Sequence, residues 1–139
     1  MRTDANMARL DETAGRSVLK HCFTQAGYEI IENYPLGLGV EGGQGEGAPA
    51  PAINLDGYDP KSRVGYEYIT TAAGDRAEVT PALLAALESL ERRGELFVLL
   101  IDEEEVSGKE SLERAAFRFL SEVERRRDGA VPASPGGHS

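Results

Sequence analysis

Two acidic residues stand in neighbouring segments that have the composition of β-strands. Asp56 lies within residues 53–58 and Glu67 within residues 64–70, and apolar or aromatic residues surround both. A carboxylate in a half-buried strand costs free energy unless a partner, a metal ion or a solvated cleft compensates for it. Carboxylate oxygens are also the ligands that Mg²⁺ prefers, and bound Mg²⁺ activates water and neutralises phosphate charge. Asp56 and Glu67 are therefore the first candidates for catalytic residues and metal ligands.

Both acids also have an ordinary structural interpretation. Asp56 belongs to an Asp-Gly dipeptide, which is a common turn former. Glu67 would, on this interpretation, point outward from its strand and pair with Lys61 or Arg63 in the preceding turn. The residue types alone leave both interpretations open.

The first half of the chain predicts one helix and three strands. Apolar residues recur at four-residue spacing over residues 7–26, which is typical of an amphipathic helix. Residues 28–34 are rich in aromatic and β-branched side chains and predict a first strand, which Pro35 would end. Residues 52–58 and 63–70 predict the second and third strands, and the short turn between them predicts antiparallel pairing.

The second half of the chain predicts a helix, a strand and a helix. Thr80 and Pro81 have the residue types of an N-cap and a first helical position. Residues 96–101 form an uninterrupted apolar run, which predicts a fourth strand at the centre of a mixed sheet. Residues 107–110 have the pattern of a capping box and predict the start of a last helix. The order αβββαβα predicts a single α/β domain over residues 1–128 with a mixed four-stranded sheet flanked by helices.

Two segments have a composition that does not favour a packed core. Residues 37–51 are rich in Gly and Pro and predict a flexible loop. The alternative, a phosphate-binding loop, requires a lysine followed by a hydroxyl residue, and this segment contains neither. Residues 129–139 are rich in Pro, Gly and Ser and predict a disordered tail.

Charge and cysteine content restrict the function further. The 139 residues carry 24 acidic and 15 basic side chains, a net charge of −9. Such a chain repels nucleic acid at long range, so binding to it would require a local basic surface or a bound cation. The chain contains no apolar run of membrane-spanning length and no signal-peptide pattern, and we expect a cytoplasmic protein without membrane contact. The single cysteine, Cys22, excludes an internal disulfide and is expected to lie in the core.

The order of elements and the two acids resemble the PD-(D/E)XK nuclease superfamily, which has the restriction-endonuclease-like fold. That family carries an acidic residue in its second strand and, in its third, Glu or Asp followed by any residue and then Lys. Asp56 and Glu67 match the two acids. The resemblance implies a Mg²⁺ cofactor and a further acid on the first helix, which Glu12 or Asp11 matches. The implied metal ligands are therefore Asp56, Glu67 and Glu12.

One position departs from the family's motif. Ile69 stands where the lysine belongs, and an aliphatic side chain can neither orient a water molecule nor stabilise charge on a phosphate. Lys61, in the turn, is the candidate replacement and would complete a catalytic set of Asp56, Glu67 and Lys61. The same resemblance thus implies an Mg²⁺-dependent nuclease that hydrolyses phosphodiester bonds with a relocated basic residue.

A second function follows from the same departure. The missing lysine and the net charge favour a nuclease-like domain with an incomplete active site, working as a non-catalytic interaction or accessory module. Its partner would be another protein or a second copy of the chain. Tyr58, Tyr66 and Tyr68 on the predicted central strands then have two interpretations, an interface or packing inside the core.

Overall fold

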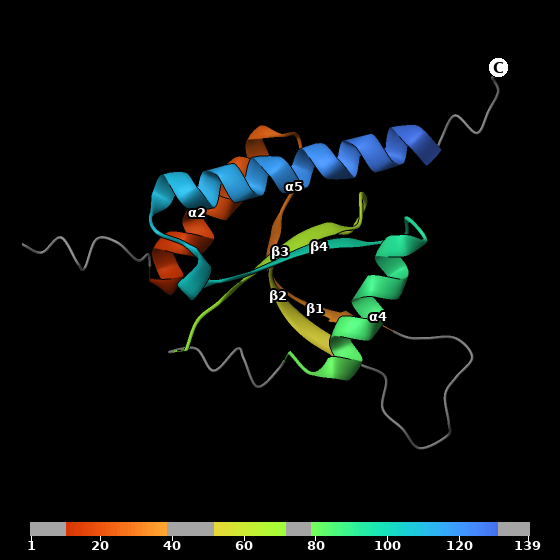
Figure 1. The fold of residues 1–139 in the computed structure, drawn as a ribbon, viewed down its shortest axis with the longest axis horizontal. Helices are drawn as coiled ribbons and strands as arrows, with labels where there is room; N and C mark the ends of the chain where they lie inside the picture. The colour runs from red at the N-terminus through yellow and green to blue at the C-terminus, as the bar shows by residue number, and fades with distance from the viewer. Residues whose placement is uncertain (1–10, 39–51, 72–78, 131–139) are drawn as a thin grey trace, which may run out of the picture.

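The computed structural model of the chain describes residues 11–38, 52–71 and 79–130 (Figure 1). Its elements in chain order are α2 (Glu12–Gln25), β1 (Ile31–Gly37), β2 (Ala52–Asp59), β3 (Val64–Ile69), α4 (Pro81–Arg92), β4 (Phe97–Asp102), a 3₁₀ helix η1 (Glu103–Glu105) and α5 (Lys109–Ala130). Over the described residues, the predicted α/β class with a mixed four-stranded sheet and three α-helices is confirmed. None of the described helices is long and apolar enough to span a membrane.

The four strands lie in the sheet in their sequence order. β2 pairs antiparallel with both β1 and β3, as the short turn between β2 and β3 predicts, and β3 pairs parallel with β4. The prediction that the fourth strand lies at the centre of the sheet is wrong, because β4 is an edge strand of the sheet that the described residues form. Helices cover both faces of β4, and this burial accounts for its apolar run. An apolar run of this kind does not distinguish a central strand from an edge strand.

Several boundaries differ from those that the sequence predicts. β1 begins at Ile31 and continues through Pro35, which lies opposite Asn54 of β2. Proline is tolerated there because β1 is an edge strand, whose outer side needs no backbone hydrogen bond. α2 begins at Glu12, and its N-cap Asp11 accepts a hydrogen bond from the amide of Ala14.

Parts of three predictions lie outside the described residues: residues 7–10 of the first helix, residues 39–51 of the Gly-rich loop and residues 131–139 of the tail. Within the described part, Gly37 belongs to β1, and α5 continues to Ala130, beyond the predicted domain boundary at residue 128.

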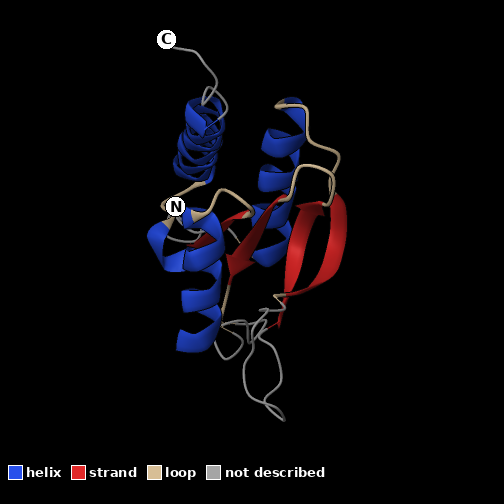
Figure 2. Ribbon diagram, turned by 90° about the vertical axis from the view of Figure 1, so that its right-hand side faces the viewer, coloured by secondary structure: helices blue, strands red, loops and turns tan. Residues whose placement is uncertain are grey.

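Helices pack on both faces of the sheet. α2 and α5 lie together on one face (Figure 2), where they bury Cys22, Tyr66 and Tyr68 among other residues. α4 covers the opposite face and packs on a second cluster that contains Tyr58 and Leu55. The three tyrosines are therefore core residues, and Cys22 is a core residue as predicted, because 1% of it is exposed.

The last turns of α5 connect three segments that are distant in the sequence. Arg126 forms an ion pair with Glu91 at 3.2 Å and also donates to the Glu91 carbonyl oxygen, at the end of α4. Arg127 donates to the carbonyl oxygen of Ser62 at 2.7 Å, in the turn between β2 and β3. Both guanidinium groups lie over the ring of Phe97, the first residue of β4. The end of α5 therefore holds this side of the sheet together.

Candidate functional site

The two predicted catalytic acids meet where the pairing between β2 and β3 ends. The last residue pair of this ladder is Gly57 with Tyr66. Beyond it, the amide of Asp56 donates to Glu67 Oε1 at 3.0 Å, and the amide of Tyr68 donates to Asp56 Oδ2 at 2.7 Å. Each carboxylate thus accepts a backbone N–H from the other strand, in the place where a carbonyl oxygen would accept in a regular ladder.

The normal alternation of faces breaks at Asp56. Leu55 packs on the α4 face, whereas Gly57 lies opposite Tyr66 on the α2 face, and Asp56 also contacts α2. Two successive residues of β2 therefore face the same helix. On β1, Asn33 lies across from this point and has a φ of 53°, a backbone conformation that asparagine tolerates better than most residues. The irregularity in both strands directs the Asp56 carboxylate toward α2.

Glu67 approaches the same point from the other side of the sheet. Its neighbours Tyr66 and Tyr68 pack on the α2 face, and its parallel partner Leu100 packs on the α4 face. Because side chains alternate between faces along β3, the Glu67 side chain leaves the strand on the α4 face, opposite to the face of Asp56. Only 1% of Glu67 and 8% of Asp56 are exposed to solvent.

These positions exclude the ordinary interpretations of the two acids. Asp56 and Gly57 are strand residues, so their dipeptide does not form a turn. Glu67 is buried, so it is not an outward-facing residue of its strand. Lys61, the predicted replacement for the missing lysine, is exposed in the turn at the closed end of the hairpin, where its amide donates to Asp59.

Arg16 of α2 supplies a positive charge to the site. Its Nε lies 3.5 Å from Asp56 Oδ1, and its Nη1 lies 3.6 Å from Glu12 Oε2. Its Nη2 donates to Asn33 Oδ1 at 2.7 Å. The guanidinium therefore contacts two of the three acids that the resemblance assigns to a metal ion. Arg16 is not among the candidate residues that the sequence pattern indicates, although its position four residues after Glu12 places both on one face of the helix.

The donor set does not favour a divalent cation in this conformation. Among the described residues, no group of three or more His, Cys, Asp or Glu side chains is arranged to hold a metal ion. The guanidinium of Arg16, at 3.5 Å from Asp56, would repel a cation bound to that carboxylate. The predicted Mg²⁺ site at Asp56, Glu67 and Glu12 stays a prediction.

Tyr66 contributes an unusual polar group beside the acids. Its hydroxyl is buried and has no hydrogen-bond partner among the described residues. Burial raises the pKa of this hydroxyl, and the negative charges of Glu32 and Asp56 raise it further, while Arg16 opposes them. A Cβ added at Gly57 would clash with the ring of Tyr66, so close packing on the tyrosine ring accounts for the glycine that follows Asp56.

Asp59, the other buried acid of β2, has a different environment. Its Oδ1 accepts from the amides of Lys61 and Ser62, and its Oδ2 accepts from the amide of Glu29 at 2.9 Å. Burial tends to raise the pKa of this carboxyl, but the hydrogen bonds outweigh that effect and lower the pKa below its ordinary value. Asp59 therefore stabilises the turn and fixes the segment that leads into β1.

Comparison with known protein families, with curated proteins and with solved structures finds no match to this chain. The α/β class and the arrangement of the acids around Arg16 are therefore inferred from this chain's own sequence and structure.

Proposed function

We propose that this chain is a nuclease-like domain with an incomplete active site, and that it works as a non-catalytic interaction or accessory module. The order of the described helices and strands agrees with the order that suggested the PD-(D/E)XK superfamily. The meeting of Asp56 and Glu67 at the end of one strand ladder supports the same assignment.

The position of Arg16 carries the non-catalytic part of the proposal. Its guanidinium contacts Asp56 and Glu12 and carries a permanent positive charge beside the place where the resemblance puts Mg²⁺. A guanidinium can neutralise these carboxylates, but it cannot lower the pKa of a bound water molecule as a metal ion does. Ile69 occupies the position of the lysine and is 8% exposed. The net charge of −9 further favours a protein partner over nucleic acid.

An Mg²⁺-dependent nuclease is the second candidate function. It is favoured by the convergence of Asp56, Glu67 and the Arg16-linked Glu12 on one region of the fold. It requires the guanidinium to leave Asp56 when the metal binds, and the side chain of Arg16 has 26% of its surface exposed for such a movement.

Calorimetric titration with Mg²⁺ and Mn²⁺ separates the two candidates. For the non-catalytic module we expect no saturable binding to the wild type at up to about 1 mM metal, a range in which functional sites of this type are occupied. Glu67→Gln keeps an oxygen for the Asp56 amide while removing a metal-binding charge. Glu122→Gln, on the exposed surface of α5, is the matched control for the change in net charge. Saturable binding that Glu67→Gln abolishes and Glu122→Gln preserves would overturn the proposal in favour of the nuclease.

A further inference from the structure

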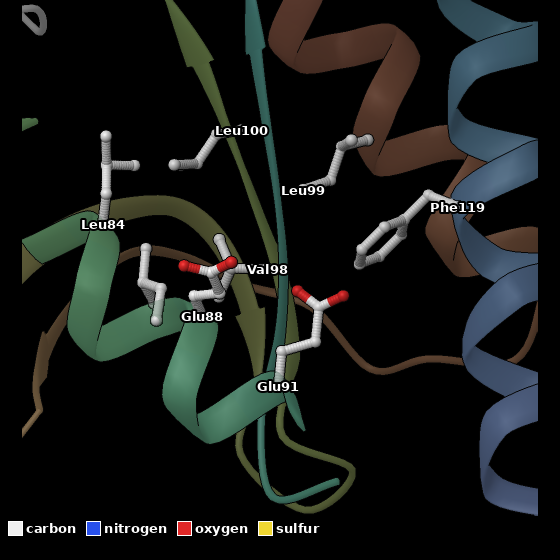
Figure 3. Close-up of a pocket in the computed structure, with 8 residues that line it drawn as sticks. Leu84, Glu88, Glu91, Val98, Leu99, Leu100 and Phe119 are labelled. Atoms are coloured by element: carbon white, nitrogen blue, oxygen red, sulfur yellow. The ribbon is translucent and has the colours of Figure 1, made fainter. Parts of the chain in front are cut away.

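An apolar groove lies along the outer edge of β4. It has a volume of about 400 Å³ and runs between α4 and α5. Figure 3 shows Leu84 and Leu100 toward one end, Phe119 of α5 on the opposite wall, and Glu88 and Glu91 of α4 toward the other end.

One edge of the β4 backbone faces this groove and pairs with no other strand of the described residues. The amide of Phe97 donates to the carbonyl oxygen of Arg63, toward β3. Alternate residues of a parallel strand bond to the same neighbour, so the amides and carbonyls of Val98 and Leu100 point to the open side. β4 is the last strand of the sheet that the described residues form, and its sequence has neither the lysine nor the proline that protects many edge strands.

Apolar side chains flank this edge on both faces of the sheet. Leu84 of α4 is 45% exposed, and Phe119 of α5 is partly buried. A strand added beside β4 would therefore gain backbone hydrogen bonds and would also bring apolar surface onto both helices. The added strand must itself be extended and apolar. β4 of a second copy meets both requirements.

The two ends of β4 differ in charge. Arg92 and Arg93, at the end of α4, lie a few residues before the strand and Arg126 lies over the ring of Phe97 at its start, each arginine beside a glutamate, whereas acidic residues alone follow the strand. The acidic residues 102–105 occupy its other end. Antiparallel pairing of two copies places the acidic end of each against the end of the other that carries the arginines. Since these arginines already have acidic neighbours within the chain, the charges set the direction of pairing more than its strength.

We propose that β4 pairs antiparallel with β4 of a second copy across a two-fold axis, which joins the two sheets into one. A two-fold axis perpendicular to the sheet keeps each helix on its own face, so that Leu84 meets the partner copy's α4 and Phe119 meets its α5. These helix contacts are needed because a stable interface buries about 800 Å² on each side, more than one short strand provides. The inference rests on the proposed interaction role, for which it names the partner, but not on the chemistry of Asp56 and Glu67.

Sedimentation equilibrium of the full chain at about 1 to 100 μM tests the proposal, with a dimer as the expected species. Leu84→Glu is expected to raise the dissociation constant by about tenfold or more, because it puts a charge into the apolar contact between the α4 helices. Phe117→Glu is the matched control: Phe117 is 52% exposed on α5 but does not line the groove. It should leave the dissociation constant unchanged.

Val98→Pro gives an independent test of the strand pairing. Its amide points to the open edge, so proline there removes no hydrogen bond to β3 but blocks an added strand. Thermal unfolding checks that the variant is folded. The proposal is overturned by a monomeric wild type at about 100 μM, by a folded Val98→Pro dimer, or by equal effects of Leu84→Glu and Phe117→Glu. Metal binding lost in Glu67→Gln would instead overturn the proposed function while leaving a dimer through β4 intact.

Discussion

The two ends of the β2–β3 hairpin each bury an acid of β2, but they satisfy its charge in different ways. At the closed end, Asp59 accepts hydrogen bonds from the amides of Glu29, Lys61 and Ser62. At the open end, Asp56 accepts an amide of β3 and contacts the guanidinium of Arg16, while a second carboxylate lies beside it. Burial of an acid alone therefore does not mark a functional site, whereas the kind of group that neutralises it is informative.

The difference has a physical origin in the number of charges. A tight turn offers several amides to one carboxylate, and these suffice to hold it ionised without a cation. The open end brings Asp56 and Glu67 together and adds Glu12 from α2 through Arg16. Several acids in a small buried volume repel one another, so the fold must either provide a cation or bind one. Here Arg16 provides it.

The largest effect is expected at the closed end. Asp59→Asn should lower the free energy of unfolding by about 3 kcal/mol at neutral pH, because an amide side chain has one acceptor oxygen and turns an N–H toward a backbone donor. Chemical denaturation of both proteins measures the difference.

The pH dependence of this difference is an internal check. The folded protein lowers the pKa of Asp59 below its ordinary value of 3.8, so the stabilisation is complete above that value. It is lost as the pH falls through the lower, folded-state pKa. The gap between wild type and Asp59→Asn should therefore narrow in acid, and a gap that stays constant down to about pH 2 would contradict this assignment.

A smaller effect is expected at the open end. Arg16→Met should lower the free energy of unfolding by about 1 to 2 kcal/mol, because it removes the guanidinium beside the buried Asp56 carboxylate while keeping most of the side-chain volume. The cost should fall in an Asp56→Asn background, where one of the repelling charges is gone. Arg93→Met, which breaks an exposed ion pair with Glu95, serves as the control and should change the stability by less than about 0.5 kcal/mol. Additive effects of Arg16→Met and Asp56→Asn would show that the two groups are not coupled.

The smallest effect, and one of opposite sign, is expected at Tyr66. Tyr66→Phe removes a buried hydroxyl that has no hydrogen-bond partner in the part of the chain that the structure describes, so the stability should stay equal or rise by up to about 1 kcal/mol. Tyr34→Phe, at a partly exposed tyrosine of β1, is the comparison and should change little. Thermal unfolding measures both, and a clear loss of stability in Tyr66→Phe would mean that the hydroxyl is hydrogen-bonded in solution.

Local sequence patterns predict most helices, strands and turns, because the formation of these elements depends mainly on residues that are neighbours in the sequence. Thr80 does cap α4, and the short turn after Asp59 does make β2 and β3 antiparallel. The place of β4 in the sheet was not predictable in this way. An apolar strand under two helices has the same composition at an edge as at the centre, and the order of strands depends on long-range pairing.

The candidate site was predictable in its acids but not in its environment. Asp56 and Glu67 are the two acids that the sequence selects on its second and third predicted strands, and a short turn between two strands brings such residues near each other. The role of Gly57 could not be predicted, because Asp-Gly is a turn former by local preference, and its actual cause is the ring of Tyr66 on the adjacent strand. The contact of Arg16 with Asp56 likewise depends on how α2 lies across the sheet.

The arginines at the end of α5 have a consequence for the time at which the domain matures during synthesis. Ser62, Glu91 and Phe97 leave the ribosome before Arg126 and Arg127, yet their contacts at this corner require those two residues. The nascent chain can form its hairpin and α4 earlier, but this corner closes only when the last turns of α5 have been made. Until then, α5 covers neither the first residue of β4 nor its outer edge. In this period, premature pairing of β4 between neighbouring chains would be easiest.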